Sequence, residues 1–113
     1  MCGIIGISSN RSVSASIINS LKKLEYRGYD SAGIATLFNG EIKEVKSEGR
    51  VDILEQNFDL KNLKGNIGIG HVRWATHGAP NSVNAHPHSS ENVSVVHNGI
   101  IENYLDLKEF LKS

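Results

Sequence analysis

The chain has 113 residues, of which 39% are hydrophobic and 21% are charged. This balance is ordinary for one globular domain, or part of one, and too apolar for a disordered chain. Twelve Lys and Arg residues balance twelve Asp and Glu residues, so we expect a small-molecule or protein partner, no nucleic acid and no membrane.

The first third of the chain is expected to form a strand, a helix and a loop. The Ile- and Gly-rich residues 2–8 predict a short buried strand, which places residue 2 at a strand end. A helix is expected next, with Ser12 or Ser14 as N-cap and an apolar stripe that ends near Glu25. Residues 25–33 contain two glycines and show no period, which predicts a loop.

A hairpin is predicted in the middle of the chain. Residues 32–38 and 41–46 read as strands and flank Asn39 and Gly40. Asn and Gly both tolerate the positive φ of a type I′ turn, so the two strands should pair in antiparallel fashion. A short helix is expected over residues 51–58.

The last third combines strands with a long polar loop. Residues 66–72 and 93–97 predict strands, and residues 102–111 predict a helix. Between the strands, residues 73–92 are expected to be a loop, and loops of that length in compact domains are usually functional or disordered. Hairpins mixed with helices favour an α+β fold with antiparallel sheets and helices on their faces. Because the chain stops near the end of a helix, we expect it to be part of a longer domain.

Cys2 is the only cysteine, and removal of Met1 would leave it with a free α-amino group. That amine has a reference pKa of about 7.7 to 8.0, so it can accept the thiol proton near neutral pH. The thiolate could then attack a carbonyl carbon. The alternative is a packing role, since Cys is often buried. A lone free thiol also favours the reducing cytoplasm.

His97, Asn98 and Gly99 follow a predicted strand and could stabilise an oxyanion. Asn98 offers a side-chain amide donor, and the backbone N–H of Gly99 can approach a ligand closely. The alternative is an ordinary Asn-Gly turn.

A second polar run, RWATHG, follows the strand predicted at residues 66–72. The planar guanidinium of Arg73 suits a carboxylate such as that of an amino acid. An exposed Arg beside a core Trp74 is the alternative. The five histidines match no zinc-binding spacing, so neither a metal ion nor another cofactor is expected.

Five segments together resemble one family, and they span nearly the whole chain: MCGIIG, LEYRGYDSAG, GHVRWATHG, VNAHPH and VVHNGIIEN. They resemble the N-terminal glutaminase domain of the glutamine–fructose-6-phosphate aminotransferase (isomerizing) family, also called glucosamine-6-phosphate synthase, within the class II glutamine amidotransferases. An amidophosphoribosyltransferase would be expected to show HRGQ in place of the YRGY of residues 26–29.

The resemblance implies an N-terminal nucleophile hydrolase fold, an αββα sandwich of antiparallel sheets, with residues 1–113 as the N-terminal portion of the domain. It implies that Cys2 forms a γ-glutamyl thioester with L-glutamine and that Asn98 and the Gly99 amide form the oxyanion hole. It also implies five substrate-binding positions: Arg73 holds the glutamine α-carboxylate, a closing loop contains Trp74, Thr76 and His77, and His86 supports the site nearby.

The resemblance also implies what lies outside these residues. The family uses an aspartate for the glutamine α-amino group, expected beyond the end of this chain, and C-terminal sugar-phosphate isomerase domains that receive the ammonia. The full-length protein is expected to be a homo-oligomer. This chain would carry only the glutaminase half-reaction.

Three alternatives to this reading are kept open. The first is another class II amidotransferase, such as amidophosphoribosyltransferase. The second is a catalytically silent module that binds glutamine, against which the intact Cys2, Arg73, Asn98 and Gly99 argue. The third is a metal-binding module built on the His-rich loop.

Overall fold

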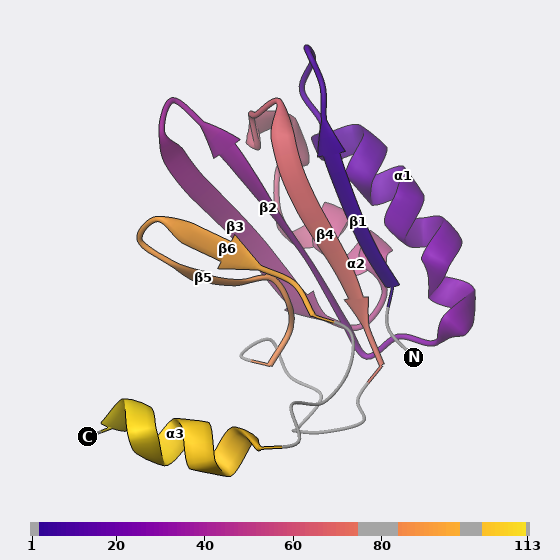
Figure 1. The fold of residues 1–113 in the computed structure, drawn as a ribbon. Coiled ribbons are helices and arrows are strands. Elements are labelled where there is room, and N and C mark those ends of the chain that lie inside the picture. Colours follow the sequence, from indigo (N-terminus) through magenta and orange to yellow (C-terminus); the bar gives the residue numbers. More distant parts are fainter. Residues whose placement is uncertain (1–2, 75–83, 98–102, 113) are drawn as a thin grey trace.

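The computed structural model describes residues 3–74, 84–97 and 103–112. Its main sheet has the strand order β1-β4-β2-β3, and all neighbouring strands in it are antiparallel (Figure 1). The strands of this sheet are β1 Gly3–Ser8, β2 Ser31–Phe38, β3 Glu41–Glu48 and β4 Ile67–Arg73.

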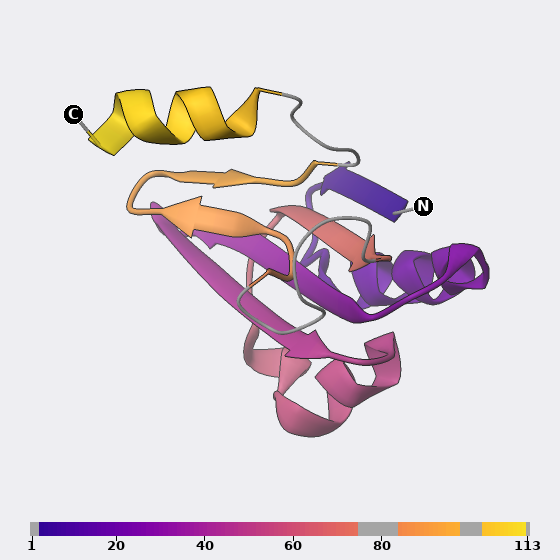
Figure 2. The same cartoon turned by 90° about the horizontal axis from the view of Figure 1, so that it is seen from below.

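Helices and a second hairpin lie on opposite faces of this sheet (Figure 2). One face packs against α1 Ser14–Leu24 and α2 Val51–Asn57. The other face carries the hairpin of β5 His88–Ser90 and β6 Val93–Val95, with α3 Tyr104–Lys112 beyond it. Helix, sheet, hairpin and helix therefore follow one another as layers, and the expected α+β fold with antiparallel sheets is confirmed.

The hydrophobic core lies between the main sheet and its two helices. Ile17 and Leu21 of α1 are fully buried, as are Ile34 of β2 and Leu54 of α2. Burial of such a side chain contributes about 1.5 to 3 kcal/mol. These contacts pack the two helices onto one face of the sheet. The opposite face, which carries the hairpin, is therefore free to hold polar residues.

The Asn39-Gly40 turn is confirmed, with φ of 52° at Asn39 and 77° at Gly40. Phe38 pairs with Glu41 directly beside it. Both turn residues have positive φ, as a type I′ turn requires. β3 continues to Glu48, two residues beyond its expected end.

The start of α1 differs from the expectation. The N-cap position is Val13, with no side-chain cap, and neither Ser12 nor Ser14 caps the helix. Val13 is buried in the core, and the Ser14 hydroxyl instead donates to the carbonyl of Leu60, at 3.2 Å. A tertiary hydrogen bond has replaced the local one.

The loop expected over residues 25–33 is shorter in the structure. Residues Glu25–Arg27 form a 3-10 turn, as do Leu60–Asn62 elsewhere, and β2 already begins at Ser31. Ser31 pairs with Arg73 on one side and with Glu48 on the other. Pairing with both neighbouring strands therefore extends β2 towards the N-terminus.

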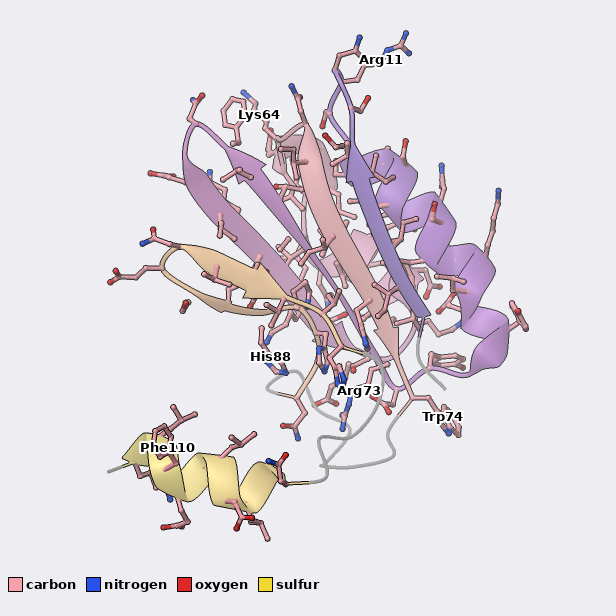
Figure 3. The ribbon with its side chains drawn as sticks, viewed as in Figure 1. Arg11, Lys64, Arg73, Trp74, His88 and Phe110 are labelled. Carbon is pink, nitrogen blue, oxygen red and sulfur yellow. The ribbon has the colours of Figure 1, made fainter. Side chains whose placement is uncertain are left out.

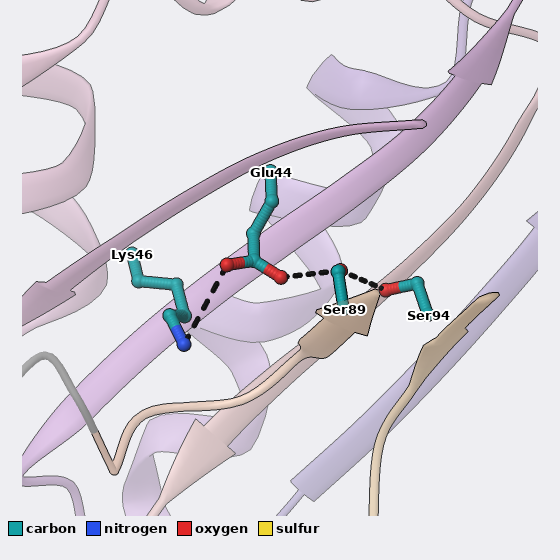
Figure 4. A network of polar contacts seen from close by, with 4 residues as sticks. All are labelled: Glu44, Lys46, Ser89 and Ser94. Carbon is teal, nitrogen blue, oxygen red and sulfur yellow. Dashed lines mark hydrogen bonds and ion pairs between the residues drawn. The ribbon is translucent and has the colours of Figure 1, made fainter. Parts of the chain in front are cut away.

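The loop expected over residues 73–92 was also partly wrong, since its described part contains β5. Ser89 of β5 donates to the carboxylate of Glu44, and also to the hydroxyl of Ser94 at 2.9 Å (Figure 4). Glu44 in turn lies 3.5 Å from the ammonium of Lys46. Polar contacts with β3 thus attach the small hairpin to the main sheet.

Candidate active site

Arg73 is the last residue of β4, and its side chain is nearly buried. Its Nη1 lies 3.6 Å from Oδ1 of Asp30, and the backbone N–H of Asp30 donates to the carbonyl of Arg73 at 2.7 Å. The same Oδ1 accepts a hydrogen bond from the Ser31 hydroxyl at 2.9 Å. Asp30 therefore orients a guanidinium fork at the end of the sheet.

Asp30 was not among the site residues expected from the sequence. Its buried Oδ2 has no hydrogen-bond partner within the described residues. The only sequence signal was an aspartate directly before a buried strand, which is too common to indicate a role.

Trp74 follows Arg73 and is about half exposed. Its ring packs against Gly28, where an added Cβ would lie 2.7 Å from Cε3 of the ring. Gly28 also has a φ of +118°, a backbone conformation that side chains disfavour. The loop after α1 and the run after β4 are therefore in contact, and Figure 3 shows Trp74 pointing away from Arg73.

His86 stacks on His71, with ring centroids 4.2 Å apart and an interplanar angle of 21°. His88 meets His86 edge-on, with centroids 4.4 Å apart. His71 is fully buried in β4. Burial, followed by the neighbouring imidazoles of His71 and His88, lowers the pKa of His86 to about 3.

The other two imidazoles of the stack also favour their neutral forms. The pKa of His71 is lowered chiefly by burial, and the nearby charge of Arg73 acts in the same direction. The pKa of His88 is lowered by burial and then by the ammonium of Lys46. The three rings therefore form an uncharged group at neutral pH.

The stacked rings both contact the backbone of His97. The ring Nε2 of His71 donates to the carbonyl of His97 at 2.9 Å. The N–H of His97 donates to Nδ1 of His86 at 3.3 Å. The backbone of His97, directly before Asn98 and Gly99 in the chain, is thus fixed beside β4.

The remaining expected site residues lie outside the described residues: Cys2, Thr76, His77, Asn98 and Gly99. Two of their described neighbours lie near the end of β4. Gly3 pairs with Val72, and His97 bonds to His71. Of the expected site residues, the structure therefore places Arg73, Trp74 and His86 near the end of β4, and the other positions are inferred from their neighbours in the chain.

Within the described residues, no three His, Cys, Asp or Glu side chains gather so that they could hold a metal ion. No described helix is long and apolar enough to span a membrane.

No protein-family model matches the chain. A glutamine–fructose-6-phosphate aminotransferase [isomerizing] of Bartonella henselae is 55% identical over 111 residues, which is 98% of this chain. That of Clostridium acetobutylicum is 55% identical over 115 residues and covers all of it. Over nearly its whole length the chain matches the N-terminal glutaminase region of this aminotransferase family. It spans only 18% and 19% of the length of these two relatives.

The structural neighbours are class II amidotransferases. The glutamine phosphoribosylpyrophosphate amidotransferase from B. subtilis, complexed with ADP and GMP, superposes with a TM-score of 0.83 at 29% identity. A second structure, described as the allosteric regulatory enzyme of purine biosynthesis, gives 0.85 at 30% identity. Each covers 99% of this chain, which matches 25% of the neighbour. The N-terminal nucleophile hydrolase fold is thereby established, and the higher identity to the aminotransferases favours that family over the amidophosphoribosyltransferase alternative.

Proposed function

We propose that this chain carries the residues that hydrolyse the side-chain amide of L-glutamine and release ammonia. The observation that carries the proposal is the convergence at the end of β4. A buried, oriented guanidinium of Arg73 lies there, together with Gly3 and His97, the described neighbours of Cys2 and Asn98 in the chain. A carboxylate anchor, a nucleophile and an oxyanion donor are what amide hydrolysis of an amino acid requires.

In the proposed reaction, the α-amino group of Cys2 takes the thiol proton, and the thiolate attacks the amide carbon of glutamine. A carbon–sulfur bond forms, and the tetrahedral intermediate then expels ammonia, which takes up the proton. A γ-glutamyl thioester remains. Water adds to this thioester, and the carbon–sulfur bond breaks to give glutamate and the regenerated thiol.

The α-carboxylate of glutamine would bind the fork of Arg73. A bidentate pair fixes direction as well as charge, and Asp30 holds the fork from the other side. Trp74, Thr76 and His77 would belong to the segment that closes over the substrate, and His86 would support it. The contact between Trp74 and Gly28 connects this segment to the loop after α1.

Asn98 and Gly99 would stabilise the developing oxyanion through a side-chain amide and a backbone N–H. Such donors act mainly in the transition state and are worth several kcal/mol in related chemistry, typically about 2.7 to 4 kcal/mol. Their position directly after the fixed residue His97 supports this assignment.

The name of the relatives suggests a role for the whole protein. We propose that residues 1–113 form the N-terminal portion of a glutaminase domain in the cytoplasm. The ammonia would pass to C-terminal sugar-phosphate isomerase domains, which convert fructose 6-phosphate to glucosamine 6-phosphate in a homo-oligomeric enzyme.

Mass spectrometry with a glutamine-analogue electrophile tests the proposal. The full-length protein, meaning the natural polypeptide that contains this chain, should lose Met1 and gain a single adduct on Cys2. Excess glutamine should protect against labelling. An adduct elsewhere, or none, would refute the assignment of the nucleophile. Glutamine binding without turnover or labelling would instead support a catalytically silent module.

A further inference from the structure

We propose that His71 and His86 are positioning residues that together clamp both backbone polar groups of His97, its N–H and its carbonyl, and thereby set the direction of the oxyanion donors that follow it. This inference rests on the proposed function, since it assigns a purpose to the clamp only if Asn98 and Gly99 stabilise the oxyanion. It assigns no contact with substrate to either histidine.

The clamp uses both polar groups of one residue. A carbonyl can only accept, so Nε2 of His71 must carry the proton that reaches the His97 carbonyl at 2.9 Å. A backbone N–H can only donate, so Nδ1 of His86 must be an unprotonated acceptor at 3.3 Å. Both tautomers are therefore set by their backbone partner.

The two rings are held in place by the sheet. His71 lies in the central strand β4, directly opposite Gly33 of β2 in register. A Cβ on Gly33 would lie only 2.0 Å from the His86 carbonyl oxygen, so the missing side chain lets residue 86 descend onto the sheet. There its ring stacks on that of His71.

The environment keeps the acceptor available. Burial together with the neighbouring imidazoles lowers the pKa of His86 to about 3, so its Nδ1 lone pair persists throughout the neutral range. The charged groups around the clamp are Arg73 at the end of β4, Asp30 just before β2, and Lys46 and Glu44 in β3. None of them replaces either hydrogen bond to His97.

Peptide geometry carries the effect to the next residue. The carbonyl oxygen of His97 and the nitrogen of residue 98 belong to one planar unit, so fixing that oxygen fixes the plane from which Asn98 departs. A misplacement of about 1 Å in a catalytic group can cost on the order of 100-fold in rate. The clamp should therefore influence turnover more than substrate binding.

The test compares apolar and isosteric replacements in the full-length protein. His71→Leu and His86→Leu remove the hydrogen-bonding atoms, whereas His71→Gln retains a donor near Nε2 and His86→Asn retains an acceptor near Nδ1. His88→Leu is the matched control, because His88 meets His86 edge-on and, within the described residues, makes no hydrogen bond to His97. Steady-state glutamine hydrolysis gives kcat and KM per folded molecule.

We expect kcat to fall about 10- to 100-fold in the two Leu variants, with KM within about twofold of wild type. The Gln and Asn variants should recover most of this loss, and His88→Leu should stay near wild type. Alkylation of Cys2 by iodoacetamide, a substitution that needs no oxyanion hole, should proceed at the wild-type rate in all of them.

Three outcomes would overturn the inference: wild-type kcat in the Leu variants, equal losses in the isosteric and Leu variants, or a rise in KM alone. Should the Leu variants fail to fold, His71→Asn and His86→Gln, whose amides lie near the wrong ring nitrogen, replace them in the comparison with His71→Gln and His86→Asn. The variant Cys2→Ala distinguishes a failure of the proposed function from a failure of the clamp. If it retains hydrolysis, the proposed function fails; if it is inactive while the clamp variants are wild type, only the clamp fails.

Discussion

Gly33 leaves the space that the carbonyl oxygen of His86 occupies: a Cβ on Gly33 would lie 2.0 Å from that oxygen. The contact joins residues that are far apart in the sequence, one in β2 and one just before β5. Because the obstacle is backbone, it cannot move aside as the end of a flexible side chain could. The approach of the His-rich segment to the sheet thus depends on a missing side chain.

The first prediction follows from this contact. Gly33→Ala should lower the free energy of unfolding by about 1 to 3 kcal/mol, the usual range for overpacking. It should also displace His86 and reduce turnover of glutamine. Denaturant unfolding and steady-state kinetics check both effects.

Gly6→Ala provides the matched control, because Gly6 lies in β1 and its added Cβ would meet only a side-chain atom of Ile69 at 3.9 Å. Its effect should stay within about 0.5 kcal/mol. Equal stability of the two variants would show that the His86 loop can move away from β2 without penalty.

A second prediction concerns the contact between Trp74 and Gly28. Gly28→Ala places a methyl group 2.7 Å from the Trp74 ring and also strains a φ of +118°. Gly49→Ala has a comparable φ of +88°, but its Cβ would lie at an ordinary 3.5 Å from the side chain of Ile53. Gly28→Ala should therefore raise the KM for glutamine more than Gly49→Ala does. The fluorescence of Trp74 should also change in the Gly28→Ala variant. Identical behaviour in both variants would leave strain alone as the cause.

The third prediction concerns acid stability. The pKa of His86 is about 3 in the folded chain and about 6.5 when unfolded, so the unfolded state binds more protons between these values. Its contribution to stability is complete above pH 6.5 and is lost progressively as the pH falls towards 3. His86→Asn should make this loss shallower, by at most about 1.4 kcal/mol per pH unit and by less for a partly exposed ring.

Unfolding by urea at several pH values between 7 and 4 measures this slope. His71 and His88 also have lowered pKa values, so part of the slope should survive in the variant. An unchanged slope would mean that His86 titrates alike in the folded and unfolded chains.

Local signals in the sequence predicted most of the main sheet and its helices. Asn39 and Gly40 carry their turn preference within two residues, and the apolar stripe of α1 repeats within a few turns. β5 was missed because its sequence, His88–Ser90, has no alternation of apolar residues; it pairs with the nearby β6 and also bonds through Ser89 to Glu44, 45 positions earlier. No local pattern records such a contact.

Candidate site residues could be named from the sequence only where a motif contained them. Arg73 and His86 were expected from their motifs, and the structure places both near the end of β4. Asp30 and His71 were not selected, because their roles arise from packing: one lies beside a guanidinium, and the other beneath a stacked ring. Residue type and spacing alone did not distinguish them from ordinary core residues.

A fourth prediction tests the carboxylate anchor. Arg73→Lys should raise the KM for glutamine at least about tenfold with a smaller effect on kcat, since Lys keeps the charge and loses the fork. Asp30→Asn should shift KM in the same direction by releasing the guanidinium. Arg11→Lys is the control, because Arg11 is exposed at the opposite end of the sheet (Figure 3). An unchanged KM in Arg73→Lys would remove Arg73 from the substrate site.

The last prediction concerns Asn98, which separates catalysis from binding. If its amide donates to the developing oxyanion, Asn98→Ala removes an interaction made mainly in the transition state. In the full-length protein kcat should then fall about 100- to 1,000-fold while KM changes little. If Asn98 served only a turn, its substitution would lower the free energy of unfolding modestly and leave kcat per folded molecule near wild type. Glutamine hydrolysis corrected for the folded fraction decides between them, and a loss under about threefold would leave the Gly99 amide as the principal donor.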